Sequence, residues 1–299
     1  MLNKEKIKLG IAPIGWTNDD MPDLGKENTF EQCISEMALA GYVGSEIGNK
    51  YPRDISVLNK ALKLRNLEIC NAWFSTLILT KPYEEIEKEI IEFADFLKAA
   101  GAKVIGVSEQ SYSIQGQLTT PVFTSRYIMN DKEWEVLCEG LNKLGKAVHE
   151  RGISLTFHHH MGTVVQTKED IDRLMKGTDS NYVSLLFDTG HLAYCDENPL
   201  EVLKEYGSRI KHIHLKDTRP AVVKVVKENN LSFLEGVRKG AFTVPGDGGG
   251  VDFISIFKEI EALDYEGYML VEAEQDPMIA NPFEYAKKAR DYIKEHTCL

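Results

Sequence analysis

The sequence predicts an α/β protein folded as a single (β/α)8 TIM barrel over residues 1–299. Short apolar runs alternate with longer amphipathic stretches along the whole chain, and no change of composition marks a second domain. Polar and ionisable residues stand at the ends of many different predicted strands, which is where barrel enzymes build their active sites. A doubly wound open sheet is the alternative fold, and this wide spread of polar strand ends favours the barrel.

The first half of the chain contains four predicted strands, each a short apolar run. They cover residues 8–14, 45–47, 68–74 and 104–107. Helices are predicted over 30–39 and 83–97, where apolar residues recur with helical spacing. The pattern Thr29-x-x-Gln32 before the first helix is a capping box, in which side chains satisfy free amide groups of the first turn.

The second half of the chain repeats the alternation. Its predicted strands cover residues 153–158, 183–187, 210–215 and 268–271. Asp131 is predicted to cap the helix before the first of these strands, and Thr167-x-x-Asp170 forms another capping box. Residues 282–293 are predicted to close the chain as a helix.

Two long segments, 110–130 and 216–250, are predicted as loops. Each follows a strand, so each is expected on the active face of the barrel, where it could cover a substrate. The second segment contains the glycine-rich run 245–250. No helix-opening G-x-G-x-x-G or G-K-[ST] pattern follows this run, so we interpret it as a turn and not as a phosphate-binding loop.

Charge and cysteine content argue against several classes of protein. The formal net charge of −11, without a run of Lys and Arg, predicts no nucleic-acid partner. The five cysteines are odd in number and contain no C-x-x-C pair, which is typical of reduced thiols in the cytoplasm. No signal peptide is recognised, and no segment approaches the roughly 18 apolar residues of a membrane span. We expect a cytoplasmic protein with no membrane partner. The acidic outer helices are either solvated or form the interface of a homo-oligomer.

Six of the eight histidines lie between His158 and His214, at the ends of predicted strands. In the fifth strand, alternation places His158 and His160 on one face and His159 on the other. The next three strands end in further polar residues, namely Asp188, His191, His212, His214, Lys216, Glu272 and Glu274. Imidazoles and carboxylates without a thiolate suit a divalent ion such as Mn, Co, Zn or Fe with positions left for water or substrate. Asp217 is interpreted as a helix-capping or turn residue.

A family resemblance is carried by three motifs, Asp188-Thr-Gly-His191, His214-Leu-Lys-Asp217 and Val271-Glu272. These motifs resemble the sugar isomerase and endonuclease-IV superfamily, whose barrels are xylose-isomerase-like. The resemblance implies one metal held by a Glu, an Asp, a His and a Glu on strands five to eight. Asp188, His214 and Glu272 match three of these ligands, while His158 occupies the strand-five position in place of glutamate. Glu274 lies on the same face as Glu272 and is the alternative ligand.

A closer resemblance covers nearly the whole chain. Its motifs are 10–20 (GIAPIGWTNDD), 44–52 (GSEIGNKYP), 158–163 (HHHMGT), 244–248 (VPGDG) and 271–277 (VEAEQDP). They look like the inosose dehydratase family of myo-inositol catabolism. The resemblance implies a hydro-lyase that converts 2-keto-myo-inositol to a trihydroxycyclohexane-1,2-dione with loss of water. It also implies Mn or Co as the metal and glutathione as a further cofactor.

This reaction requires a base and an acid beside the metal, which polarises the ketone and stabilises the enolate left when the α-proton departs. We predict His160 as the base, because related barrel dehydratases place a base two residues after the strand-five ligand. Lys216 and His191 are the candidate donors of a proton to the leaving β-hydroxyl. The alternative for Lys216 is a solvated loop lysine, and the alternatives for His191 are a metal ligand, a substrate hydrogen bond or a helix cap. The residues predicted to hold the ring hydroxyls stand at the ends of strands one to four, and they are Trp16, Glu46, Asn71 and Glu109. Core packing is the alternative role for Trp16.

Three other functions use or share this barrel. A ketose or inosose epimerase or isomerase would abstract the same proton and return it to carbon, but these enzymes usually keep the strand-five Glu that His158 replaces. A DNA-repair nuclease would carry further metal-binding histidines at the ends of early strands, where this chain has Asn71 and Glu109. A non-enzymatic sugar-binding or regulatory protein would not need this set of ionisable groups.

Overall fold

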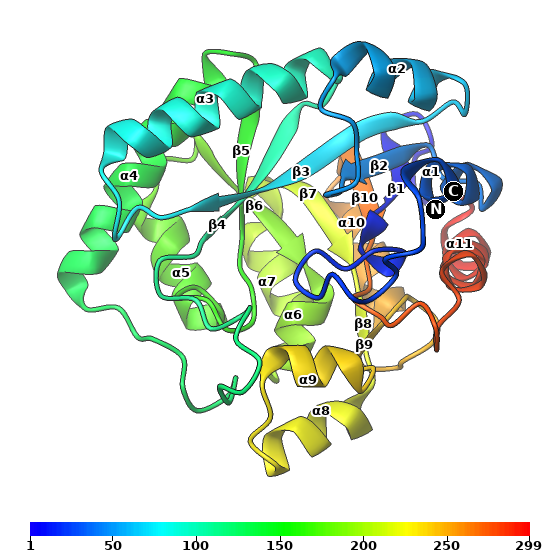
Figure 1. Ribbon diagram of the computed structural model, residues 1–299. Helices are drawn as coiled ribbons and strands as arrows, with labels where there is room; N and C mark the ends of the chain where they lie inside the picture. Colours follow the sequence, from blue (N-terminus) through cyan, green and yellow to red (C-terminus); the bar gives the residue numbers. More distant parts are fainter.

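Eight parallel strands close into a barrel in the computed structural model, which describes residues 1–299 (Figure 1). The strands are β1 (Ile7–Ile11), β2 (Gly44–Ile47), β3 (Glu68–Thr76), β4 (Val104–Glu109), β5 (Ser154–His158), β6 (Val183–Asp188), β7 (Ile210–Leu215) and β10 (Gly267–Val271). Each strand pairs with its neighbours in the sequence, and β10 pairs with β1 to close the ring. The predicted α/β barrel is therefore confirmed.

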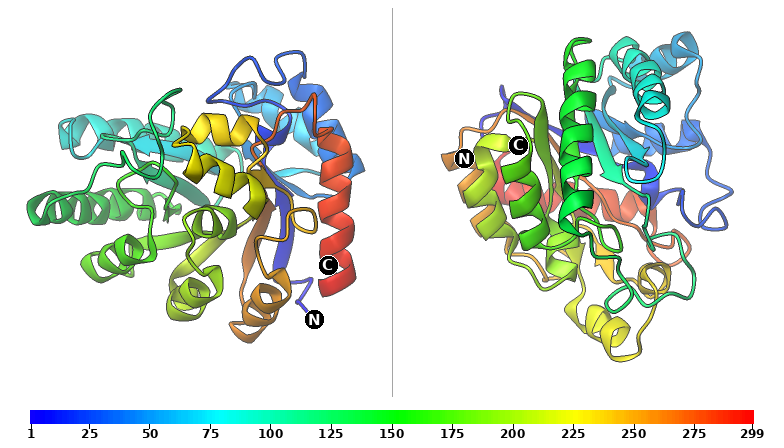
Figure 2. Two further views of the ribbon diagram at one scale, coloured as in Figure 1. Left: turned by 90° about the horizontal axis from the view of Figure 1, so that it is seen from below. Right: turned by 90° about the vertical axis from the view of Figure 1, so that its left-hand side faces the viewer.

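Helices surround the barrel and connect its strands (Figure 2). They are α1 (Phe30–Leu39), α2 (Ile55–Lys63), α3 (Tyr83–Ala99), α4 (Asp131–His149), α5 (Lys168–Gly177), α7 (Pro199–Tyr206), α10 (Phe253–Ala262) and α11 (Pro282–Thr297). A short helix, α6 (Thr189–Tyr194), follows β6 directly, and 3-10 turns occur at Pro13–Gly15 and Gly207–Arg209. None of the helices has the length and apolar character needed to cross a membrane.

The start of α4 corrects one predicted cap. Asn130, and not Asp131, is the N-cap: its side chain accepts a hydrogen bond from the Glu133 amide at 3.1 Å. The Glu133 carboxylate accepts one in return from the Asn130 amide at 2.8 Å. This reciprocal pair satisfies two amides at once, which a cap at Asp131 would not do. Asp131 is instead the first helical residue, where its charge favours the helix dipole.

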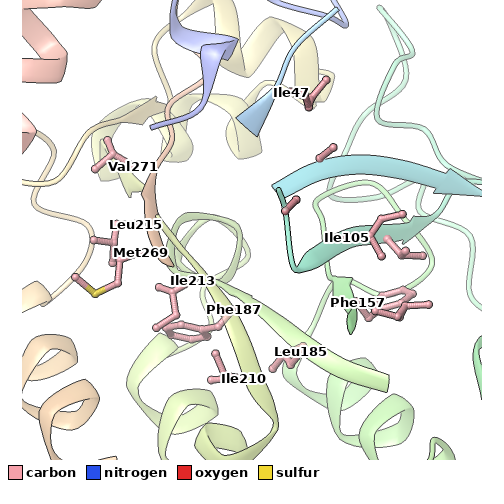
Figure 3. Packing of buried hydrophobic residues seen from close by; sticks show 14 of the residues in the cluster. Ile47, Ile105, Phe157, Leu185, Phe187, Ile210, Ile213, Leu215, Met269 and Val271 are labelled. Carbon is pink, nitrogen blue, oxygen red and sulfur yellow. The ribbon is translucent and has the colours of Figure 1, made fainter. Parts of the chain in front are cut away.

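Strand residues alternate between the helices and the barrel interior. The outward positions, among them Phe157, Phe187 and Ile213, belong to a cluster of 65 buried residues that forms the main core (Figure 3). The interior is narrow: a Cβ added at Gly10 would lie 2.9 Å from Leu270 Cδ1 and 3.2 Å from Cys70 Sγ. Because small and apolar residues fill this interior, the inward polar side chains gather at the carboxyl ends of the strands.

The segment 216–250 is not the irregular loop predicted from the sequence. It contains the helices α8 (Pro220–Glu228) and α9 (Phe233–Arg238), drawn in yellow in Figure 1, and the antiparallel pair β8 (Asp217–Thr218) and β9 (Phe242–Thr243). These helices form because their apolar side chains find a small core of their own. We call this core the rim cluster: Met21, Leu24, Val122, Met161, Tyr194, Val223, Val226, Phe233, Leu234, Val237, Ala241 and Phe242. The cluster joins segments that follow β1, β4, β5, β6 and β7 at the active face.

Candidate active site

A cavity of about 220 Å³ opens at the carboxyl ends of the barrel strands. Ionisable side chains form much of its lining: Asp19, Asp20, Glu46, His158, His160, His214, Glu272 and Glu274. Trp73 and Phe93 contribute an apolar surface, and Arg53 is the only Lys or Arg in the lining. This combination suits a small polar ligand that has one reactive region and one less polar face.

The four predicted metal ligands converge beside this cavity, on strands β5, β6, β7 and the segment after β10. Asp188 Oδ2 lies 3.6 Å from His158 Nε2 and 3.5 Å from His214 Nδ1. His214 Nδ1 lies 2.8 Å from Glu272 Oε2. Alternation explains the convergence, because the residues before them (Phe157, Phe187 and Ile213) point outward into the main core.

Several polar atoms at the centre of this group lack a hydrogen-bond partner. Asp188 Oδ2 and His214 Nε2 are buried without one, and His214 Nδ1 lies close to Glu272 Oε2 without the alignment of a hydrogen bond. Leaving a buried polar atom unsatisfied costs about 1–3 kcal/mol. Two overlapping groups, His158–Asp188–His214 and Glu46–His214–Glu272, each place three ligand atoms within 4.8 Å of one another. The donor set and the unsatisfied atoms therefore fit a divalent cation.

Burial and neighbouring charges set the protonation states of these residues. Burial lowers the pKa of His214, but the carboxylates of Glu272 and Asp188 outweigh it and raise that pKa to about 10. Burial raises the pKa of Asp188, but Lys216 and His191 hold it well below its usual range. Burial lowers the pKa of His158 to about 4, so this imidazole is neutral and its lone pairs are available. A cation entering the site must displace the proton of His214.

His160 combines access to the cavity with a fixed tautomer. Its Nδ1 lies 2.8 Å from the carbonyl oxygen of Met161, so Nδ1 carries the proton and donates it there. Nε2 is then free to accept a proton, and it lies 3.7 Å from Glu274 Oε1. The ring packs edge-on against Trp73, with centroids 5.6 Å apart. His159 points to the other face, as predicted, where its Nε2 accepts a hydrogen bond from the Asp188 amide at 3.3 Å.

Lys216 and His191 lie beneath the cavity and do not line it. Lys216 Nζ contacts Glu272 Oε1 at 2.6 Å, His191 Nε2 at 3.0 Å and Glu274 Oε2 at 3.1 Å. A neutral imidazole accepts at one nitrogen only. His191 Nδ1 accepts a hydrogen bond from the Met161 amide at 3.3 Å and its Nε2 faces Lys216 Nζ, so the two donors compete for the one acceptor nitrogen.

Two of the four residues predicted to hold hydroxyl groups lie at or next to the cavity. Glu46 lines it, and Asn71 donates from Nδ2 to Glu46 Oε1 at 3.1 Å. Burial raises the pKa of Glu46 to about 8, so this side chain is mostly protonated at neutral pH. A protonated carboxyl both donates and accepts hydrogen bonds, which matches a hydroxyl group.

Trp16 and Glu109 do not line the cavity. Trp16 Nε1 donates to Glu36 Oε2 at 2.5 Å, and the ring is buried in the main core. Glu109 accepts hydrogen bonds from the amides of Ile78 at 2.9 Å and Ser111 at 3.0 Å, so it fixes two loops. The structure thus satisfies both polar groups without a ligand and gives no support to their predicted contact with substrate.

Other lining residues were not predicted from the sequence. Gln115 Nε2 donates to Asp20 Oδ2 at 2.9 Å, which joins the loop after β4 to the loop after β1. Arg53 comes from the segment before α2, and Trp73 from within β3. Strand alternation does not predict where Gln115 and Arg53 lie, because both belong to loops whose path depends on tertiary packing.

The glycine-rich run is a turn held by the chain's own carboxylate. Asp217 accepts hydrogen bonds from four consecutive amides, those of Gly248, Gly249, Gly250 and Val251, at 2.9–3.1 Å. These amides form an anion-binding concavity of the kind that cradles phosphate, and Asp217 fills it. The interpretation of the run 245–250 as a turn is therefore confirmed, whereas Asp217 itself lies in β8 and holds this turn through its side chain.

Comparison with known proteins adds sequence relatives that cover the whole chain. A model of the xylose isomerase-like TIM barrel family matches residues 28–296. An inosose dehydratase of Clostridium perfringens is 67% identical over 293 residues, 98% of each chain. Another, of Clostridium botulinum, is 64% identical over 299 residues, and one of Bacillus thuringiensis is 60% identical, each over 100% of both chains.

Solved structures show the same fold at low sequence identity. A probable 3-DHS dehydratase of petrobactin synthesis from Bacillus anthracis has a TM-score of 0.71 at 14% identity, covering 96% of this chain and 98% of that one. A D-allulose 3-epimerase from Methylomonas has a TM-score of 0.68 at 17% identity, covering 99% of each chain. Because dehydratases and epimerases both occur among these neighbours, the fold alone does not choose between the two reactions.

Proposed function

Because the chain belongs to the xylose isomerase-like TIM barrel family and, within it, to the inosose dehydratases, we propose that it is a hydro-lyase acting on inosose. The reaction converts 2-keto-myo-inositol to a trihydroxycyclohexane-1,2-dione with loss of water. The structural observation that carries this proposal is the free Nε2 of His160, which faces the cavity shared with the proposed metal ligands.

The proposed metal is Mn or Co, held by His158, Asp188, His214 and Glu272. When bound, such an ion polarises the ketone and stabilises the negative charge that develops on its oxygen. Glu272 is preferred to Glu274 as the ligand because its Oε2 lies 2.8 Å from His214 Nδ1 and it shares ligand groups with His214 and Asp188, whereas Glu274 shares one only with His160 and His191. We assign no residue to glutathione, which the family resemblance implies as a further cofactor.

The protein's own residues supply the proton transfers. His160 Nε2 accepts the α-proton, and its Nδ1 hydrogen bond to the Met161 carbonyl holds the ring in position. The β-hydroxyl departs as water after it takes up a proton, and the resulting enol tautomerises to the dione. We propose that Lys216 and His191 supply this proton through Glu274, which contacts Lys216 and lines the cavity. His160 then passes the α-proton back to Lys216 through Glu274, whose Oε1 lies 3.7 Å from His160 Nε2, so both groups regain their starting protonation states before the next cycle.

Binding of the ring hydroxyls is assigned to the side of the cavity formed by β2 and β3. Glu46, mostly protonated at neutral pH, is both a donor and an acceptor there, and Asn71 orients it. A site that satisfies hydroxyl groups with buried polar residues rejects analogues that lack those hydroxyls. The contact between Gln115 and Asp20 restricts the entrance on the side of the loops.

We further propose that the enzyme works in the cytoplasm on a free polyol ketone, without a nucleic-acid or membrane partner. The net charge of −11 and the unpaired cysteines support this setting. Light scattering of the protein as it elutes from a size-exclusion column measures whether the outer helices form a homo-oligomer.

The experiment that tests the reaction uses metal-stripped protein with 2-keto-myo-inositol, with and without Mn or Co. We expect a metal-dependent ultraviolet band from the conjugated enol product, lost in His160→Ala. His159→Gln is the matched control. The amide oxygen of the new glutamine can still accept the hydrogen bond from the Asp188 amide, and position 159 does not line the cavity. Deuterium uptake from heavy water without the band would indicate the alternative function, an epimerase or isomerase. The absence of both signals would refute the proposal.

A further inference from the structure

The ammonium group of Lys216 is buried completely among acidic side chains. Its Nζ lies 2.6 Å from Glu272 Oε1, 3.1 Å from Glu274 Oε2 and 3.6 Å from Asp188 Oδ2. A charged amine is taken this far from water only where opposite charges compensate its lost hydration. The carboxylates of three separate residues provide that compensation.

The surrounding chain is shaped to hold this lysine. A Cβ added at Gly190 would lie 2.4 Å from Lys216 Cγ and 2.7 Å from its Cδ, so only glycine leaves room for the lysine stem. The hydroxyl of Thr189 accepts from the Lys216 amide at 3.0 Å and donates to its carbonyl at 2.7 Å. The ring of Phe242 lies 4.6 Å from Nζ and covers it from the side of the rim cluster.

The position of this ammonium coincides with a second set of potential metal ligands. Two groups of ligand atoms contain His191: one with Asp188 and Glu272, and one with His160 and Glu274. Lys216 Nζ contacts all three members of the first group and two members of the second, with His191 Nε2 at 3.0 Å. Such mixtures of carboxylate and imidazole, next to a first metal site, are typical of two-metal enzymes.

We propose that the ammonium group of Lys216 takes the place of a second metal ion and so limits this site to one divalent ion per chain. It prevents Glu272 and Glu274 from binding a second ion. Its single positive charge compensates carboxylates that would otherwise attract another metal, and its stem occupies the space. The proposal rests on the metal site proposed above, and it does not depend on the substrate.

The test counts the manganese bound to each chain. Wild-type protein and the Lys216→Ala variant are equilibrated with excess Mn, freed of unbound metal by gel filtration and analysed for Mn per chain and by electron paramagnetic resonance. We expect one isolated Mn per wild-type chain. In Lys216→Ala we expect a rise towards two, with the spectrum of a spin-coupled pair. Lys224→Ala, at an exposed lysine of α8, should keep one Mn.

A double variant and the wild type together keep the proposal falsifiable. Lys216→Ala with Glu274→Gln removes the carboxylate of one of the two groups, so we expect a lower Mn count than in Lys216→Ala alone. Two Mn in the wild type would overturn the proposal, as would one Mn in a folded Lys216→Ala variant. Where that variant does not fold, Lys216→Ser takes its place, and one Mn in it would also overturn the proposal. A rise towards two Mn in the variant, together with no reaction of the wild type on inosose, would support the inference and refute the proposed function, so the two are separable.

Discussion

Gly190→Ala tests whether the placement of Lys216 depends on the missing side chain. The new methyl group would lie 2.4 Å from Lys216 Cγ and 2.7 Å from both its Cβ and its Cδ. These atoms belong to the stem near the backbone, which Thr189 holds through two hydrogen bonds, so the lysine cannot move aside as a free end could. The substitution must therefore displace either the lysine or helix α6.

Two effects of opposite sign set the magnitude. Alanine is favoured over glycine within a helix by about 1 kcal/mol. Overpacking of a tight interior costs about 1–3 kcal/mol, and a weakened buried ion pair adds to this cost. We expect a net loss of about 2 kcal/mol in the free energy of unfolding, equivalent to a fall of about 3 °C in Tm for a chain of 299 residues.

Urea unfolding followed by circular dichroism and thermal unfolding by scanning fluorimetry measure this loss. Gly116→Ala is the matched control, because a Cβ there meets nothing within 4 Å and its backbone conformation is open to alanine. We expect the control to match the wild type within about 0.5 kcal/mol. A Gly190→Ala protein as stable as the wild type, or more stable, would refute the reasoning, since helix propensity would then have prevailed over packing.

Three further predictions follow from other features of the structure. Because the pKa of His214 is raised to about 10 without metal, the apparent affinity for Mn should rise about tenfold per pH unit between pH 6.5 and 8.5, and a flat titration would contradict this. Ellman's reagent should modify one thiol per native chain, the exposed Cys298, because burial raises the pKa of the other four; all five should react after unfolding. Asp217→Ala should lower stability by about 2–3 kcal/mol, partly restored by sulfate, because four amides lose their acceptor; an unchanged Tm would argue against this role.

The strands, and the inward-facing residues at their ends, could be predicted because both follow from the local pattern of apolar and polar residues. Buried parallel strands read as short apolar runs, and alternation then fixes which strand-end residues face inward, as at His158, Asp188 and His214. Capping boxes mark helix starts for the same local reason, as at Thr167. The convergence of the four proposed metal ligands was therefore accessible from sequence.

The remaining features depend on packing between distant segments. Helix α9 carries its own signal, the capping box of Ser232 and Glu235, but the rim cluster that stabilises it draws on residues from five connections. Trp16 and Glu109 stand near strand ends, as substrate-binding residues do, yet their polar groups turn to Glu36 and to loop amides. Only the three-dimensional course of the loops distinguishes these cases.

The rim cluster couples the loops at the entrance of the barrel to one another through packing. Phe233 of α9 belongs to this cluster, and its ring lies 5.2 Å from that of His160. A change in the packing of α9 can therefore displace the proposed base. Loops that are anchored separately can be exchanged one at a time as a lineage acquires new substrates. Here the five connections share one apolar cluster, so a substitution that changes the packing of one loop is expected to disturb the others unless a second substitution compensates for it.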